Sequence, residues 1–183
     1  MNRKTSDSET AEDRQIKTKR LPSAKSKVLS LLARREHSQQ ELKTKLVQRG
    51  YTEEEAGDAI RWALSHQFQS DERFAVSLVR RRASTFGDRA IEAELSRHGL
   101  PAKKLEALDG NDSGSETDRA AAWIRRRKMS ALNSLFSTNG MADPNDLFKL
   151  KSSVFRALGS RGFEFSHIDH AWRLILDEFN SNA

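Results

Sequence analysis

The chain has 183 residues, of which 32 are Lys or Arg and 26 are Asp or Glu, so its formal net charge is +6 at pH 7. It has no cysteine, which excludes disulfide bonds, thiol catalysis and cysteine-ligated zinc, and no apolar run approaches the roughly 18 residues of a membrane span. Charged residues make up 32%, against a usual value of about 25%. We therefore expect a cytoplasmic all-α protein built of small helical units, and the basic balance favours an acidic partner, nucleic acid first.

The first predicted unit follows a polar arm at residues 1–20, which we expect to be disordered and which lacks the apolar core of a secretory signal. Residues 21–66 carry three short helical patterns. Ser38 and Thr52 each precede a helix as its N-cap, with Glu three residues later as in a capping box, and Gly50 ends the middle helix. The residues expected on the inner faces are Val28, Leu29, Leu31, Leu32, Leu42, Leu46, Val47, Ala56, Ala59, Ile60, Ala63 and Leu64.

The second predicted unit, residues 67–109, repeats this plan. Ser70 caps its first helix, Asp88 leads into a second helix that ends at Gly99, and Pro101 begins a shorter third helix. The apolar residues expected to face inward are Phe74, Ala75, Leu78, Val79, Ile91, Leu95, Leu105 and Leu108.

A short, flexible, acidic linker at residues 110–116 precedes the third predicted unit, residues 117–179. Its first helix is expected to end near Lys128, and residues 130–142 are expected to form an irregular insertion. Inside this unit, we expect the apolar stripes to consist of Ala120, Trp123, Ile124, Leu147, Leu150, Val154, Leu158, Ile168, Ala171, Trp172 and Ile175.

Two further helices are predicted after that insertion. Asp143 and Pro144 are typical of an N-cap followed by the first helical residue. Gly162 ends this helix, and Ser166 is expected to cap the last one.

The clearest feature of the sequence is an internal repeat centred on Gly50, Gly99 and Gly162. Each of these glycines follows a leucine by four residues and precedes an apolar residue directly. Recurrence at such intervals indicates an array of units that stack on their neighbours. We therefore predict three tandem three-helix repeats in an elongated, curved array.

Catalytic motifs are absent: there is no P-loop, no G-x-G-x-x-G, no G-x-S-x-G and no H-E-x-x-H. His167 and His170 stand three residues apart on an expected helix and could suggest a metal pair, but the start of a solvated helix is the simpler interpretation. We predict no enzymatic activity, no catalytic residue, no metal, no cofactor and no small-molecule substrate.

Basic clusters end the expected first helix of each repeat. Cations in a last turn stabilise a helix by about 0.3–1 kcal/mol, and one or two residues satisfy that role, so the runs of three and four in the second and third repeats favour contact with phosphate or acidic protein. Cations on the second helices could extend this surface, although simple solvation explains them better. The candidate binding residues are Arg34, Arg35, Lys43, Lys45, Arg80, Arg81, Arg82, Arg89, Arg125, Arg126, Arg127 and Lys128.

Aromatic side chains are expected mainly in the core, and no exposed aromatic ladder suited to base stacking is evident. If nucleic acid binds, single- or double-stranded, we expect contacts to the phosphate backbone, which are sensitive to salt and weakly dependent on sequence.

Three stretches, in order along the chain, resemble the repeats of a known family. The first is Arg34-Arg35-Glu36-His37-Ser38-x-x-Glu41-Leu42-x-x-Lys45-Leu46-x-x-Arg49-Gly50-Tyr51. The second is Asp71-Glu72-Arg73-Phe74-Ala75, followed by Val79-Arg80 and Gly87-x3-Ile91-x2-Glu94-Leu95. The third is Arg127-Lys128, then Asp143-Pro144, then Leu158-x2-Arg161-Gly162-Phe163-x-Phe165-Ser166-x-Ile168. Together they are similar to bacterial RecX, the regulatory protein family of the RecA recombinase.

The resemblance implies an all-α array of three three-helix units that binds RecA and the RecA–DNA filament. Members of the family are thought to lie in the filament groove and to limit ATP hydrolysis, strand exchange and co-protease function. Two alternatives remain from the residues alone: a DNA-binding helical protein that acts independently of RecA, and a scaffold for an acidic protein unrelated to DNA.

Overall fold

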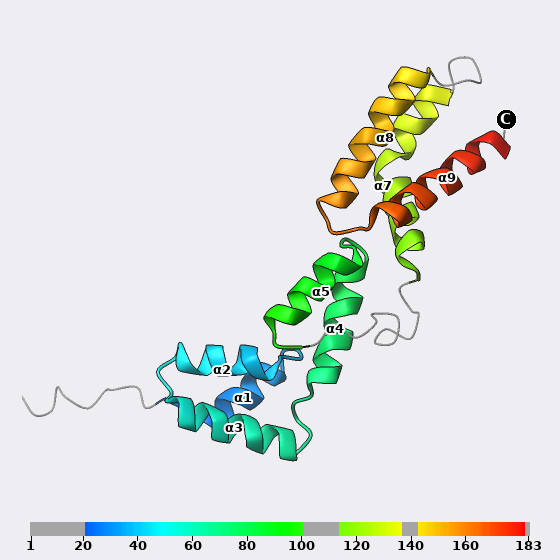
Figure 1. Cartoon of the computed structure of the whole chain (residues 1–183). Coiled ribbons are helices and arrows are strands. Elements are labelled where there is room, and N and C mark those ends of the chain that lie inside the picture. The colour runs from blue at the N-terminus through cyan, green and yellow to red at the C-terminus, as the bar shows by residue number, and fades with distance from the viewer. Residues whose placement is uncertain (1–20, 101–113, 137–142, 182–183) are drawn as a thin grey trace, which may run out of the picture.

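The computed structural model describes residues 21–100, 114–136 and 143–181, and within these ranges it is all-helical. The elements follow one another along an elongated molecule (Figure 1). Unit 1 contains α1 (Ala24–Leu32), α2 (Gln39–Val47) and α3 (Glu53–Ser65); unit 2 contains α4 (Asp71–Ala83) and α5 (Asp88–Arg97); unit 3 contains α7 (Glu116–Phe136), α8 (Pro144–Gly159) and α9 (Phe165–Ser181). No helix in these ranges is long and apolar enough to cross a membrane.

The predicted N-caps of unit 1 are confirmed, with one difference. Thr52 forms the full capping box with Glu55, because the Thr52 hydroxyl accepts from the Glu55 N–H at 3.1 Å and Glu55 Oε2 accepts from the Thr52 N–H at 2.8 Å. Ser38 accepts from the Glu41 N–H, but the Glu41 carboxylate binds Arg35 rather than the Ser38 backbone. The second box is therefore only half formed.

The core of unit 1 is narrower than the sequence suggested. Val28 and Leu31 are buried on α1, and Leu42 and Leu46 on α2, but Leu29 and Val47 are exposed. Neighbouring helical residues point about 100° apart. A side chain directly beside a buried residue in these short helices therefore falls outside the buried stripe.

Unit 2 matches the expected pattern over its described residues. Ser70 accepts from the Arg73 N–H as N-cap of α4, and the apolar residues Phe74, Leu78, Ile91 and Leu95 are buried in one cluster. The third helix expected from Pro101, with Leu105 and Leu108, lies outside the described residues, as do the arm 1–20 and most of the linker.

Unit 3 corrects the predicted insertion. Helix α7 begins at Glu116, the last residue of the predicted linker, and continues through residues 130–136 instead of ending near Lys128. Leu132 is fully buried and Phe136 stacks on Phe179 with ring centroids 5.0 Å apart. These two apolar residues extend the helical stripe, which the polar residues between them obscured in the sequence; residues 137–142 lie outside the described part.

The other two helices of unit 3 begin as follows. Asp143 caps α8 by accepting from the N–H groups of Asn145 and Asp146, as predicted. For α9, the Ile168 N–H donates to the Glu164 carbonyl, so the helix begins before Ser166. Ser166 therefore lies in the first turn and not at the N-cap. The predicted inner residues Ile168, Ala171, Trp172 and Ile175 are all buried.

The three repeated glycines adopt the same backbone conformation. Gly50, Gly99 and Gly162 have φ values of 92°, 74° and 83°, in the left-handed region that glycine reaches without strain. Each of the three units has its own apolar cluster. The all-α repeat array is thereby confirmed, while the exact domain boundaries 21–66, 67–109 and 117–179 stay a prediction.

The junction between units 1 and 2 consists of side-chain hydrogen bonds. The Asp71 carboxylate accepts from the Gln39 backbone N–H at 3.0 Å and from Gln39 Nε2 at 2.9 Å. Gln69 Nε2 donates to the His37 carbonyl at 3.1 Å, and Arg73 pairs with Glu36 at 2.7 Å. These polar contacts join α2 and the turn before it to the start of α4.

The junction between units 2 and 3 is built from close backbone contact. The Gly87 N–H donates to the Arg161 carbonyl at 3.0 Å. A Cβ atom at Gly87 would lie 2.3 Å from the Phe163 nitrogen, and one at Gly162 would lie 2.6 Å from the Ala90 nitrogen. The two turns therefore meet at a distance that only glycine permits.

Candidate functional site

The basic cluster of unit 2 lies in the last turn of α4, as predicted. Arg82 is held in place: its guanidinium donates to both oxygens of Glu94, at 2.8 and 2.9 Å, and lies over the Phe86 ring. The hydrogen bond that Arg82 donates to Glu94 raises the pKa of Arg82. Arg80 and Arg81 are exposed, and within the described residues Arg81 makes no ion pair. The cluster thus combines one anchored cation with two at the surface.

The basic cluster of unit 3 occupies the interior of α7, because this helix continues to Phe136. The prediction that this cluster ends a helix is therefore wrong. Because the helix dipole acts only within the last turn, it does not explain these cations either. Arg125 pairs with Glu178 of α9, and the hydrogen bond that it donates to this carboxylate raises the pKa of Arg125. Arg127 is exposed, Lys128 is half-buried, and neither pairs with an acidic group in the described ranges.

One contact joins the two clusters. Arg126 Nη2 donates to the Ser84 carbonyl at 3.0 Å, and Ser84 is the C-cap of α4, two residues after Arg82. Residues from the middle of α7 and the end of α4 therefore meet across the boundary between units 2 and 3. We call the two runs together, Arg80–Arg82 and Arg125–Lys128, the basic junction surface.

The predicted cations of unit 1 are mostly engaged with carboxylates. Arg35 binds both oxygens of Glu41, and Lys45 lies 3.3 Å from the same carboxylate. Burial acts to raise the pKa of Glu41, but the hydrogen bond from Arg35 and the neighbouring positive charges hold it below its ordinary value. Lys43 pairs with Glu53 at 3.0 Å. Unit 1 therefore presents less uncompensated charge than its sequence suggests.

Two predicted site residues lie apart from these groups. Arg34 is exposed in the turn after α1, and Arg89 is exposed in the first turn of α5. Neither forms an ion pair with a described residue, and no contact joins either of them to the basic junction surface.

A groove of about 720 Å³ follows the outer face of α4. It reaches from Glu36 of unit 1 to Arg80 and Arg81, and Glu72 and Arg73 also line it. Both signs of charge are present, and Val76 adds an apolar contact. Such mixed walls match a polypeptide surface better than a run of phosphates, which presents one sign only.

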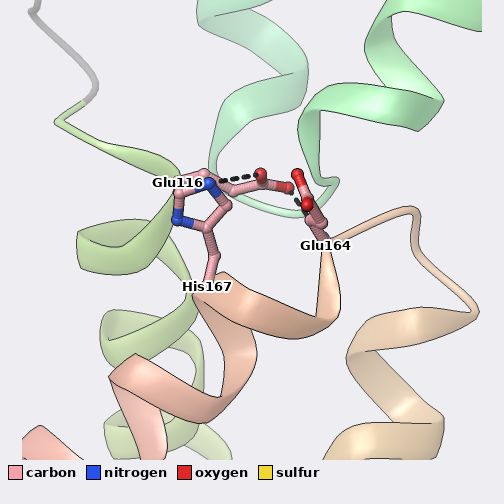
Figure 2. Close-up of side chains that lie close together, drawn as sticks. All are labelled: Glu116, Glu164 and His167. Atoms are coloured by element: carbon pink, nitrogen blue, oxygen red, sulfur yellow. Dashed lines mark hydrogen bonds and ion pairs between the residues drawn. The ribbon is translucent and has the colours of Figure 1, made fainter.

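The sequence did not indicate the cluster of charged and polar side chains around Glu116 at the junction between units 2 and 3. Glu116 at the start of α7 is buried, and Glu164 and His167 stand beside it (Figure 2). The nearby Arg119 pairs with Asp88 at the start of α5. No local pattern signals this arrangement, because its members come from three segments far apart in the chain.

The burial of Glu116 shifts its ionisation. Desolvation raises the pKa of this carboxyl group above its ordinary value, although backbone N–H groups of Asp88 and Glu164 donate to it. The opposite holds for His37 at the first junction, where burial lowers the pKa of the imidazole. Among the described residues, each junction thus contains a buried group whose pKa is shifted by burial.

Comparison with known families identifies both N-terminal units. Residues 24–62 match the RecX first three-helix domain, and residues 70–107 match the RecX second three-helix domain. The second match covers residues 101–107 as well, where the sequence predicted a third helix.

Curated relatives extend the match to most of the chain. The regulatory protein RecX of Xanthomonas campestris pv. campestris (strain B100) is 37% identical over 153 residues, which cover 83% of this chain and 87% of the relative. RecX of Stenotrophomonas maltophilia (strain K279a) is 36% identical, with 92% and 98% covered, and RecX of Herbaspirillum seropedicae is 32% identical, with 85% and 94% covered. The crystal structure of RecX from Lactobacillus salivarius has the same fold, with a TM-score of 0.57 at 19% identity over 82% of this chain and 92% of that one.

Proposed function

Because the chain belongs to the RecX family of regulatory proteins, we propose that it binds RecA and the RecA–DNA filament and inhibits the activities of RecA. The inhibited activities are ATP hydrolysis, strand exchange and co-protease function, and the binding place is the filament groove. The protein acts by binding and not by catalysis, in the cytoplasm, within recombination and the SOS response.

The basic junction surface is the observation that carries this proposal. The contact from Arg126 to Ser84 brings the basic runs of two units next to each other on the elongated array. Excess positive charge at one place attracts acidic protein or DNA phosphate. In the filament groove, both are in reach of one extended molecule.

The shape of the array supports the proposed mode of inhibition. Its units follow one another along a line (Figure 1), so a single molecule can contact more than one RecA protomer. A bridge between protomers would obstruct the subunit movements that hydrolysis and strand exchange require. The mixed charge of the α4 groove supports a direct contact with RecA in addition to any contact with DNA.

The alternative function is sequence-nonspecific DNA binding without an effect on RecA. The exposed cations Arg81 and Arg127, which make no ion pair in the described residues, favour it, because phosphate contacts need only exposed positive charge. This alternative predicts retention on DNA at low salt, loss at high salt, and unchanged RecA activity at the same protein concentration.

The primary test is RecA ATPase activity on single-stranded DNA with this protein added below the RecA concentration, using RecA from the same organism. Inhibition at substoichiometric amounts is the expected result, since one bound molecule affects several protomers. No inhibition at a molar excess contradicts the proposal. DNA binding in that case, measured by fluorescence anisotropy without RecA, would favour the alternative.

Charge reversal tests the basic junction surface itself. The double variant Arg81→Glu/Arg127→Glu changes two exposed cations that make no ion pair in the described structure, so the fold should stay intact by circular dichroism. We expect its affinity for the RecA–DNA filament to fall about tenfold or more, equivalent to about 1.4 kcal/mol.

The matched control is Arg49→Glu/Arg156→Glu, which reverses two exposed cations, one after α2 and one in α8, that make no ion pair with a described residue and lie outside the basic junction surface. Its affinity should change much less. Equal losses in the two double variants would show that net charge alone determines binding and would remove the junction from the proposed site.

A further inference from the structure

Three potential metal ligands converge where unit 3 meets unit 2. Glu116 is the first residue of α7, Glu164 directly precedes α9, and His167 lies in the first turn of α9. One donor atom from each lies within 4.8 Å of the other two. Figure 2 shows the Glu116 carboxylate between the imidazole of His167 and the side chain of Glu164.

Glu116 brings to this cluster a buried side chain, one oxygen of which accepts no hydrogen bond from a described residue. Its side chain is 5% exposed. Oε1 accepts from the backbone N–H of Asp88 at 3.0 Å and of Glu164 at 3.3 Å, whereas Oε2 faces His167 Nε2 at 3.7 Å, too far for a hydrogen bond. No described residue donates to Oε2. A cation next to such a largely buried carboxylate would stabilise its charged form.

His167 is held in the orientation of a ligand. Its Nδ1 lies 2.9 Å from the Thr117 hydroxyl, so the other ring nitrogen, Nε2, faces Glu116. A hydrogen bond at one ring nitrogen is the usual arrangement of a histidine that binds metal through the other. The His167 side chain is 41% exposed and Glu164 is exposed. The Glu164 side chain can therefore rotate toward an ion, and an ion can enter from solvent.

We propose that Glu116, Glu164 and His167 form a binding site for one divalent transition-metal ion of the Zn²⁺ class. Two carboxylate oxygens and one imidazole nitrogen are a donor set that Zn²⁺ accepts, with water in the fourth position. The ion supplies the positive charge that Oε2 of Glu116 lacks and that two neighbouring carboxylates favour. The proposal does not depend on RecA binding.

The site differs from the histidine pair that the sequence suggested. His170 is exposed on the next turn of α9 and is not part of the cluster of donor atoms. Because Glu116 accepts a hydrogen bond from Asp88 of unit 2, a bound ion would also strengthen the junction between units 2 and 3.

The test is a titration of the metal-free full-length chain with ZnCl₂ in competition with a chromogenic chelator, and a second titration followed by thermal unfolding. We expect one ion per chain and a higher Tm with Zn²⁺. His167→Gln and Glu164→Gln, both at exposed side chains, should each weaken binding about tenfold or more, since even an outer-shell partner of a metal ligand contributes this much. The matched control, His170→Gln, should bind Zn²⁺ as the unaltered chain does.

Three results would overturn the proposal. The first is no saturable binding up to millimolar ZnCl₂. The second is equal weakening by His170→Gln and His167→Gln, which would assign the ion to the histidine pair. The third is unchanged affinity in Glu164→Gln and His167→Gln together, which would place any bound zinc elsewhere. Circular dichroism of each variant without metal checks that the helices are retained.

Discussion

The two junctions hold neighbouring units together through different groups. Units 1 and 2 are joined by side chains that reach across: Asp71 accepts two hydrogen bonds from Gln39, and Gln69 donates to the His37 carbonyl. Units 2 and 3 are joined by direct backbone contact at Gly87 and by the buried carboxylate of Glu116.

The two junctions should differ in how well they tolerate mutation. Side chains at the first junction can adopt other rotamers, and water can replace a lost partner at its partly exposed rim. At the second junction the backbones themselves are in contact, so an added atom has no space. We therefore expect the second junction to be the more sensitive to mutation, although both connect units of the same family.

Among the variants that test this comparison, we expect Gly87→Ala to lower the stability of the protein most. The φ of Gly87 is −80°, which alanine adopts easily, so any loss comes from the new Cβ against Phe163 and Gly162. Overpacking of this kind costs about 1–3 kcal/mol, and separation of units 2 and 3 relieves it. Small-angle X-ray scattering should show a larger radius of gyration, and thermal unfolding a lower Tm.

The control for this variant is Gly57→Ala in α3, where the added Cβ would meet only the flexible Arg61 side chain at 3.3 Å. Alanine in a helix interior is favoured over glycine by about 0.5–1 kcal/mol, so this variant should be neutral or slightly stabilised. A compact, fully stable Gly87→Ala would show that the contact between the two turns is not needed.

A smaller effect is expected from Asp71→Ala at the first junction. The change removes the acceptor of three hydrogen bonds. Gln39 is half-buried and can bind water, and the buried Gln69 still donates to the His37 carbonyl, so we expect a loss of about 1–1.5 kcal/mol. Chemical denaturation measures it, and the radius of gyration should stay unchanged. A loss larger than that of Gly87→Ala would reverse the ranking of the two junctions.

The smallest expected effect is that the stability of the two junctions depends differently on pH. Burial lowers the pKa of His37, so its contribution to stability is present at neutral pH and is lost as pH falls below the ordinary histidine value of about 6.5. Burial raises the pKa of Glu116, so its contribution has the opposite sign. It increases as pH falls through the raised pKa toward the ordinary glutamate value of about 4.3.

Hydrogen exchange followed for each unit between pH 7.5 and 5 should therefore show weaker protection around α2 at low pH and no such loss at the start of α7. In Glu116→Gln, the stability of the second junction should no longer depend on this carboxyl group. A parallel decline at both junctions in the unaltered chain would contradict the assignment.

Local features of the fold were predictable from the sequence because their signals are local. Thr52 and Asp143 satisfy N–H groups two or three residues away, and Gly99 allows a φ that other residues avoid. Where local signals were weak the predictions were wrong: the polar residues near Leu132 hid the second half of α7, and Ser166 resembled a cap although the helix had already begun.

The pairing of the candidate binding residues was not predictable in the same way. The sequence indicated where cations cluster, but not that Arg82 forms an ion pair with Glu94 or that Arg35 forms one with Glu41. The contact from Arg126 to Ser84 joins positions far apart in the chain, and so does the convergence of Glu116 with His167. Such contacts depend on how the units pack against one another, and this packing cannot be read from local patterns in a single sequence.

The length of α7 gives the second junction a mechanical consequence. The helix begins at the junction with Glu116 and ends at Phe136, about 30 Å away at 1.5 Å per residue. It acts as a lever: a rotation of about 10° at its base would displace its tip by about 5 Å but Arg125–Lys128, near its midpoint, by only about half as much. A small adjustment at one glycine contact therefore changes the reach of unit 3 considerably, while the cations near the midpoint of α7 move about half as far as its tip.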